Sequence, residues 1–257
     1  MQQSNQACVP ELINHILPIT GIPSFHFEFP TKWLYTEITP AAIRNAKGLH
    51  LITCLTTNGN KVQILLEELK DIYGLEWTTS LIDIDTDEQK KPWFLKLNPN
   101  GKIPVLIDNT GPEPFPVIES EQIPCESTPP LYIYTNRDEK AFHQLSNTAD
   151  AIERFKAETL RVYNVLELHL SGRLTIHPRE YLAGNSLGKF SIADINAYPW
   201  VRGGGKRSKI SEEEMDSYPH VKKWIGRIES RPGVQRGTSD IYDEDVHPEL
   251  LISTANE

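Results

Sequence analysis

The sequence has few cysteines, and its three, Cys8, Cys54 and Cys125, lie far apart. They form neither a CxxC pair nor a metal-ligand spacing, and the histidines show no such spacing either, so we expect no metal and no disulfide framework. Widely spaced thiols that stay reduced are typical of a reducing compartment. We therefore expect a cytoplasmic protein.

Long apolar runs and an excess of positive charge are also missing. No stretch approaches the roughly 20 residues that span a bilayer, and the N-terminus lacks the basic head and apolar core of a secretory signal. The 26 basic residues are outnumbered by 35 acidic ones, for a net charge of −9. Because such a chain repels nucleic acid and anionic lipid, we expect neither nucleic acid nor a membrane as a partner.

The first half of the chain alternates strand and helix patterns after a proline-interrupted extension, residues 1–47, in which only 40–47 favours a short helix. An apolar strand at 49–55 is followed by Val62, Leu65, Leu66 and Leu69, which share one helix face. Gly74 ends that helix, and 76–84 reads as a second strand. This βαβ pattern predicts two parallel strands.

Two short strands complete this half. Residues 103–107 predict a strand with Pro104 near its start, and 116–118 predict another after a turn rich in glycine and proline. We therefore predict a thioredoxin-like domain over residues 48–120.

The second half shows helical patterns without strands. Prolines make residues 121–150 an irregular linker, and an all-helical domain is expected over 151–238. Ser191-Ile192-Ala193-Asp194 and Ser211–Glu214 are capping boxes that predict helix starts. Residues 239–257 form an acidic tail that we expect to be disordered or loosely packed. The predicted class is α+β followed by all-α.

Several motifs together resemble the glutathione S-transferase superfamily. Asn98–Asp108 is similar to its N-P-x-G-x-[VI]-P-x-L signature, and Glu119-Ser120 is similar to its Glu-Ser pair. Ser191–Ile195 is similar to its S-x-A-D-[IV] box, and Arg231–Val234 is similar to its RPxV ending. The four motifs occur in the family's order. Residues 57–62 and 199–201 resemble the fungal class related to the yeast nitrogen-regulator prion protein. The likeness covers about residues 48–120 and 151–237.

This resemblance implies glutathione as co-substrate, a small electrophile as the second substrate, a role in detoxification and a possible homodimer. The family has two long helices between the Glu-Ser pair and the helix predicted at Ala151. This chain has a shorter interval there, so we expect a shortened helical domain.

The resemblance also implies a glutathione site. Pro104 would follow a cis peptide bond, with the Ile103 backbone pairing with the cysteinyl unit of glutathione; an ordinary trans proline at a strand edge is the alternative. Glu119 would hold the ammonium and Ser120 the carboxylate of the γ-glutamyl end. The alternative for this pair is a plain helix N-terminus.

Asn58 matches the position where the family activates sulfur. Its amide would donate to the thiolate, which is the nucleophilic form, and lower the thiol pKa. Asn-Gly is also a common turn pair, and Thr56 and Thr57 are alternative hydroxyl donors. Cys54 is a weaker candidate for a different role, that of a thioltransferase nucleophile.

Basic and amide groups could bind the glycyl carboxylate. Gln89 or Lys90 could reach it, but the matching family position often holds His or a basic residue, so this sequence departs from the family there. Lys102 is a further candidate for binding glutathione, and plain surface charges are the alternative for both lysines. Asp194 is expected to cap a helix and matter to folding.

Three functional hypotheses remain open. The first is a glutathione transferase that conjugates an electrophile or reduces peroxides or disulfides. The second is a non-catalytic glutathione-fold module that regulates a partner. The third is a product that does not fold stably.

Overall fold

The computed structural model describes residues 34–118, 149–174 and 177–252. The predicted linker thus lies almost wholly outside the described residues, as does most of the N-terminal extension. Within the extension, the short helix expected between residues 40 and 47 is present as α2 (Ala41–Arg44).

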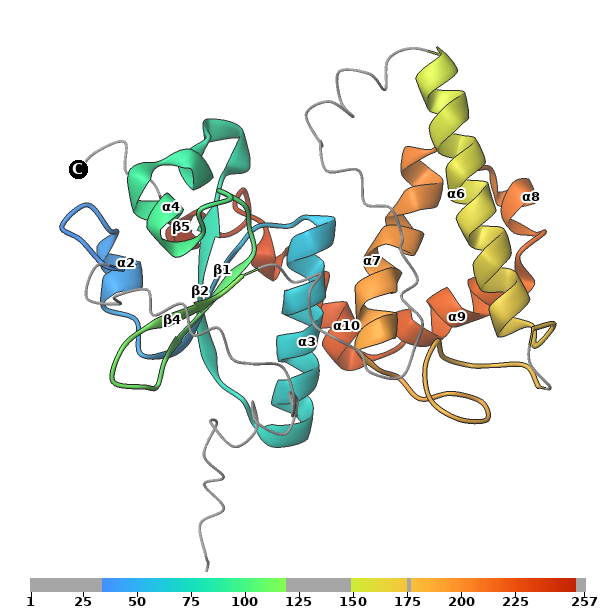
Figure 1. The fold of residues 1–257 in the computed structure, drawn as a ribbon, viewed down its shortest axis with the longest axis horizontal. Helices are drawn as coiled ribbons and strands as arrows, with labels where there is room; N and C mark the ends of the chain where they lie inside the picture. The colour runs from blue at the N-terminus through green and yellow to red at the C-terminus, as the bar shows by residue number, and fades with distance from the viewer. Residues whose placement is uncertain (1–33, 119–148, 175–176, 253–257) are drawn as a thin grey trace, which may run out of the picture.

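A five-stranded sheet forms one half of the molecule, with the strand order β4-β3-β1-β2-β5 (Figure 1). The central strands β1 (Gly48–Thr53) and β2 (Trp77–Ile82) are parallel, as predicted. The hairpin of β3 (Val105–Asn109) and β4 (Phe115–Val117) adds to β1 in antiparallel sense. The thioredoxin-like arrangement expected from the sequence is confirmed.

Helix α3 (Thr57–Tyr73) connects the two parallel strands. The hydroxyl of Thr56 accepts a hydrogen bond from the Gly59 amide at its start, and Gly74 ends it in the left-handed conformation. Leu66 packs with Leu51 and Leu81 of the sheet. These contacts bury the apolar stripe that the sequence predicts.

The opposite face of the sheet is covered by α2 and α4 (Pro92–Leu97). The chain runs from β2 to α4 through the short 3-10 turns η2 (Ile84–Thr86) and η3 (Glu88–Lys90). Trp93 and Phe94 of α4 pack with Ile52 and Ile82 in this second layer of the core. The fold is therefore helix, sheet and helix in three layers.

The second half of the molecule is helical, as predicted. Its helices are α6 (Ala149–Leu170), α7 (Ile192–Arg207), α8 (Glu212–Met215) and α9 (Pro219–Glu229). Tyr163, Tyr198 and Trp224 lie in its core. In the part of the chain that the structure describes, no helix is both long and apolar enough to cross a membrane.

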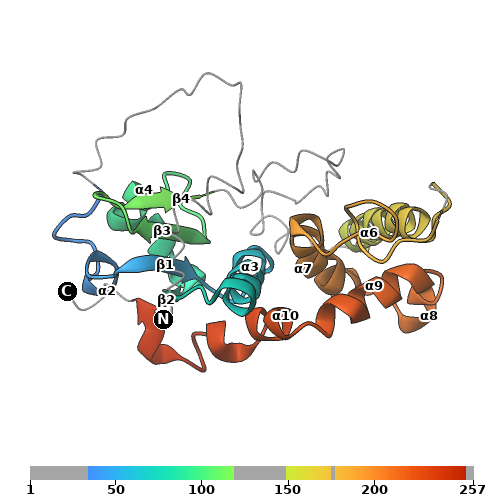
Figure 2. The same cartoon turned by 90° about the horizontal axis from the view of Figure 1, so that it is seen from below.

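Helix α3 and the short helix α10 (Pro232–Gly237) join the two halves (Figure 2). The Arg231 guanidinium donates to both carboxylate oxygens of Glu68, at 2.8 and 2.5 Å. Arg236 instead bridges two carboxylates, with its Nε paired with Glu67 and its Nη2 with Asp71. These partly buried, two-bonded contacts hold the helical half against α3.

The expectation of a loosely packed tail is wrong for residues 240–252. After η4 (Asp240–Tyr242) and η5 (Pro248–Leu250), strand β5 (Leu251–Ile252) pairs in parallel with β2. Tyr242 and Ile252 are buried against the sheet half. A few isolated apolar residues anchor this segment, so it carries no periodic pattern that sequence analysis could detect.

Candidate functional site

The turn after β1 and the loop before β3 meet at one end of the sheet. Ile52 pairs with Val105 in the antiparallel register, so the chain leaving β1 and the chain entering β3 lie side by side. Asn58 follows on the first side and Pro104 precedes on the second. The register thus brings together two of the predicted site segments, which are far apart in the sequence.

The turn before α3 is closely packed. A Cβ on Gly59 would lie 2.2 Å from the Cys54 carbonyl oxygen, so only glycine fits there. The buried Gln63 amide donates to Thr53 Oγ1 at 3.0 Å and to the Cys54 carbonyl at 3.2 Å. The Gln63 side chain of α3 therefore stabilises the backbone turn that leads to Asn58.

Asn58 lies in the first turn of α3 and is half-buried. Among the described residues its Oδ1 is buried without a hydrogen-bond partner. The Thr56 hydroxyl oxygen accepts the helix-cap bond from the Gly59 amide and keeps its own proton to donate, and Thr57 is buried. Since the partnerless atom of Asn58 is an acceptor, the three side chains remain alternative donors.

The loop before β3 is shaped by Asn98. Its side-chain amide donates to the Lys102 carbonyl at 2.8 Å, and its Oδ1 accepts from the Asn100 amide at 3.0 Å. The Ile103–Pro104 peptide bond is cis, as predicted. Asn98 is buried, so it acts as a structural support for this loop.

The candidates for a carboxylate contact occupy different settings. Gln89 is buried and donates to the Ile84 carbonyl at 3.0 Å, whereas the Lys90 ammonium donates to the Gly101 carbonyl at 2.6 Å. Lys102 is exposed beside Ile103. Both Lys90 and Lys102 thus flank the loop that carries Pro104, and Gln89 supports the turn behind it.

Glu119 and Ser120 lie outside the described residues. The last strand before them, β4, pairs its Val117 with Leu106 of β3, two residues beyond Pro104. Their predicted role stays a prediction.

Asp194 has the structural role expected from its capping box. It is fully buried and accepts hydrogen bonds from the Leu182 amide, the Ser191 amide and the Trp224 indole. Burial raises the pKa of this carboxyl, and the hydrogen bonds oppose the rise.

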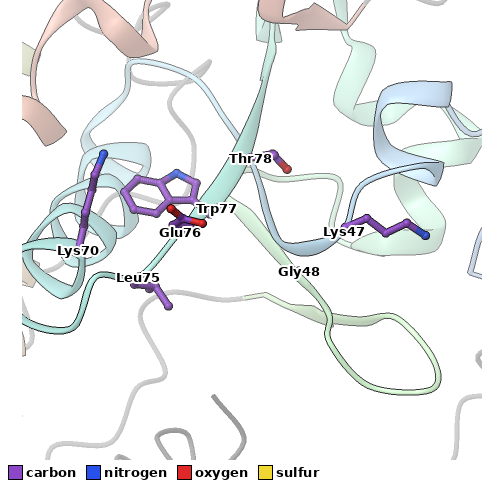
Figure 3. Close-up of a pocket in the computed structure, with 7 residues that line it drawn as sticks. All are labelled: Lys47, Gly48, Lys70, Leu75, Glu76, Trp77 and Thr78. Carbon is purple, nitrogen blue, oxygen red and sulfur yellow. The ribbon is translucent and has the colours of Figure 1, made fainter. Parts of the chain in front are cut away.

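A separate open cleft lies at the other end of the sheet (Figure 3). Its lining residues come from the starts of β1 and β2 and from the end of α3: Lys47, Gly48, Lys70, Leu75, Glu76, Trp77 and Thr78. It is therefore remote from the turn that carries Asn58. Within residues 34–118, 149–174 and 177–252, no group of three His, Cys, Asp or Glu side chains could hold a metal ion.

Sequence reasoning missed three polar residues that surround the turn: Asn60, Lys61 and Gln63. Asn60 donates to Gln63 Oε1 at 2.9 Å and to the Gly237 carbonyl at 3.2 Å. Lys61 is buried, with its ammonium 5.6 Å from the ring centroid of Trp200. The signal that could have identified them is that three polar residues lie close together in α3, a helix that also carries an apolar stripe.

Comparisons with known families identify the two domains of the chain. Residues 57–125 match the family described as "Glutathione S-transferase, N-terminal domain", and residues 123–232 match "Glutathione S-transferase, C-terminal domain". The first match begins at the first residue of α3 and includes the proline loop.

Three similar proteins illustrate the range of relatives. The disulfide-bond oxidoreductase YfcG of Escherichia coli is 31% identical over 206 residues, covering 69% of this chain and 88% of the relative. Glutathione transferase URE2P6 from Phanerochaete chrysosporium, in complex with oxidized glutathione, is 27% identical with a TM-score of 0.60, covering 80% and 99%. Ure2p in complex with glutathione is 25% identical with a TM-score of 0.56, covering 75% and 93%.

Proposed function

Since this chain belongs to the glutathione S-transferase superfamily, we propose that it binds glutathione between the start of α3 and the loop before β3. The bound sulfur then attacks a small electrophile or a disulfide as its thiolate. The observation that carries the proposal is the convergence of the Asn58 turn and the Pro104 loop at one end of the sheet. Of the two structural relatives named above, Ure2p contains bound glutathione and URE2P6 contains bound oxidized glutathione.

In this proposal the start of α3 stabilises the thiolate. The Asn58 amide donates a hydrogen bond to the sulfur, which favours the charged form and lowers the thiol pKa. The first turn of the 17-residue helix carries no acidic side chain, so the positive end of its dipole adds to the effect.

The remaining contacts hold the rest of the peptide. The Ile103 backbone pairs with the cysteinyl unit, and Glu119 and Ser120 bind the γ-glutamyl ammonium and carboxylate. Lys102 is exposed and can meet the glycyl carboxylate directly, whereas Gln89 would first have to give up its bond to Ile84. We therefore favour Lys102 over Gln89 for that contact.

The chemistry of the two reactions differs only after the thiolate forms. With a carbon electrophile, the sulfur forms a bond to carbon while the leaving group departs with its electron pair. With a disulfide, the sulfur attacks one disulfide sulfur, and the other leaves as a thiolate, which gives a mixed disulfide. The name of the E. coli relative favours testing the second reaction alongside the first.

An Asn58→Ala variant tests the role of this residue. Turnover of glutathione with 1-chloro-2,4-dinitrobenzene and with 2-hydroxyethyl disulfide should fall by about 10- to 100-fold, because a preorganised donor to the thiolate is lost. Asn45→Ala, at the end of α2, is the matched control and should leave turnover unchanged. Unchanged turnover in the Asn58 variant would remove Asn58 from the mechanism.

Glutathione binding is measured separately by calorimetry. A Ser120→Ala variant should bind glutathione about 10-fold more weakly, because a hydrogen bond to a carboxylate is lost. If the wild-type protein binds glutathione without turnover in either assay, the regulatory binding module replaces the enzyme as the best function. Absence of a cooperative unfolding transition would favour the third hypothesis, a chain that does not fold stably.

A further inference from the structure

A stripe of polar residues runs along one side of α3. Its members follow one another at intervals of three, four and four residues, which places them on one helix face: Asn60, Gln63, Glu67 and Asp71. Arg236 of α10 pairs with Glu67 and Asp71. Asn60 donates to the carbonyl of Gly237, also in α10. The contact between α3 and α10 therefore extends along this stripe to the first turn of α3.

The bond from Asn60 satisfies the end of α10. Gly237 is the last residue of that helix, and the final carbonyls of a helix have no partner within it. Asn60 Nδ2 donates to this carbonyl at 3.2 Å. The two backbones are in close contact there, because a Cβ on Gly237 would lie 2.6 Å from the Ile64 nitrogen. The end of α10 thus has a fixed position beside the first turns of α3.

The same Asn60 amide also connects to the end of β1. It donates to Gln63 Oε1 at 2.9 Å, while Gln63 Nε2 donates to Thr53 Oγ1 and to the Cys54 carbonyl. Since only the oxygen of a glutamine amide accepts and only its nitrogen donates, the bond from Asn60 fixes the orientation of the buried Gln63 amide. An unbroken chain of hydrogen bonds therefore links α10 to the end of β1.

The Cys54 carbonyl is the point where this chain reaches the turn before α3. It accepts a further bond from the Thr56 amide at 2.8 Å, and the Thr56 hydroxyl accepts from the Gly59 amide at 3.1 Å. Asn58 lies between these two residues in the sequence. Movement of the Cys54 carbonyl therefore moves the backbone on both sides of Asn58.

We propose that Asn60 is a positioning residue, which couples the position of α10 to the geometry of the Asn58 turn through Gln63. This inference rests on the proposed function of the same site. Asn60 itself does not contact glutathione; it acts by holding the turn from which Asn58 reaches the sulfur. A displacement of about 1 Å in such a group can lower a rate by about 100-fold. The last helix of the helical half thus takes part in setting the geometry of a site in the sheet half.

An Asn60→Leu variant tests the coupling, because leucine has nearly the same shape and no hydrogen-bond donor. In fully folded protein, kcat with glutathione and 1-chloro-2,4-dinitrobenzene should fall about tenfold, because the sulfur contact is displaced. KM for glutathione should change by less than about twofold, because the groups that hold the peptide are unchanged. Asn60→Ala suits a helix and is the second variant if Asn60→Leu does not fold; it should give the same result.

A double variant of Asn60→Leu and Gln63→Met distinguishes one chain of bonds from two independent supports. Because each single variant breaks the same chain, kcat of the double variant should fall about tenfold, as in each single variant, and not about 100-fold. Asp71→Asn is the matched control. It removes a bond to Arg236 from the same stripe near the other end of α3, and it should leave kcat unchanged.

A further measurement examines the turn without glutathione. Hydrogen exchange of the Gly59 amide, followed by nuclear magnetic resonance, should be about tenfold faster in Asn60→Leu than in the wild type. It should be unchanged in Asp71→Asn. This readout depends on the turn alone and not on the reaction.

Three results would overturn the inference. One is a wild-type kcat in both Asn60 variants, and another is a kcat of the double variant that falls by the product of the two single losses. The third is a loss of stability in Asn60→Leu with unchanged exchange of Gly59, which would make Asn60 a purely structural residue. Failure of the proposed function is recognised separately, by a wild-type protein that does not bind glutathione in calorimetry.

Discussion

The two halves of the molecule treat their buried polar groups differently. In the helical half, Asp194 accepts bonds from three separate segments, and Glu167 accepts two backbone amides at the start of α9 together with the His220 ring. In the sheet half, His50 Nε2, Asn58 Oδ1 and Gln89 Oε1 are buried without partners among the described residues, whereas in the helical half such an atom, Asn196 Oδ1, lies on α7, the helix that faces α3. Because buried polar atoms are normally paired, the unused Oδ1 of Asn58 indicates a place prepared for a ligand.

The largest effect is expected in the helical half. Asp194→Ala should lower the free energy of unfolding by about 4 kcal/mol, because it leaves several buried donors unpaired. Urea unfolding followed by circular dichroism measures the loss. Glu214→Ala, which removes a half-buried capping-box side chain and its ion pair with Lys156, is the control and should cost about 1 kcal/mol or less. Similar losses in both variants would contradict the structural weight given to Asp194.

The next effect belongs to the sheet half and depends on pH. Burial lowers the pKa of His50 from its ordinary value of 6.5 to about 4, so between these pH values the unfolded chain binds a proton that the folded chain does not. Stability is therefore fully present above pH 6.5 and is lost as the pH falls toward 4, by about 3 kcal/mol in total. Unfolding curves of wild type and His50→Gln at pH 7 and pH 5 measure this, and the loss should be smaller in the variant.

The opposite sign is expected from Asp194. Because burial raises the pKa of that carboxyl, the folded chain holds its proton more tightly, and this group favours the folded state as the pH falls. If stability falls at low pH as much in His50→Gln as in the wild type, another titrating group, in either half, causes the fall.

A smaller effect is expected where the halves touch. Gly237→Ala would place a methyl group 2.6 Å from the Ile64 backbone nitrogen, and should cost about 2 kcal/mol through overpacking. Gly226→Ala, on an open face of α9, should instead stabilise the protein by about 0.5–1 kcal/mol. Thermal unfolding of both variants measures the contrast, and equal shifts would show that α10 can move away from α3 at little cost.

The variant with the smallest expected loss of stability should show a larger loss of activity. Gln63→Met removes the amide that holds the Cys54 turn but keeps the side-chain volume, so we expect a stability loss of about 1 kcal/mol. Turnover with glutathione should fall more than stability suggests, by about tenfold, because the Asn58 backbone loses its support. Full activity at wild-type stability would show that the turn needs no such support.

Those helices and strands whose residues show a local pattern were predicted well from the sequence. The apolar stripe of α3, the strand at 49–55 and the capping boxes at Ser191 and Ser211 all correspond to observed elements. The short helices α4 and α10 were missed because six residues are too few to show a helical period. Strand β5 was missed because its pairing with β2 depends on the rest of the fold.

The candidate site was only partly predictable for a similar reason. Asn58 and Pro104 could be identified because they lie in motifs, and the register of β1 with β3 brings their segments together. Lys61 and Gln63 belong to one helix, but their burial depends on α7 and on the Cys54 turn, which no local pattern encodes. Tertiary neighbours therefore decide which polar residues of α3 are buried.

Strand β5 has a consequence for how the chain is made. The edge of β2 is completed by Leu251 and Ile252, which are synthesised about 170 residues later. A nascent sheet half on the ribosome therefore lacks this pairing along β2 until residues 251–252 emerge. Shortening the chain from its C-terminal end should thus impair the first domain to be synthesised, although the cut lies in the last segment.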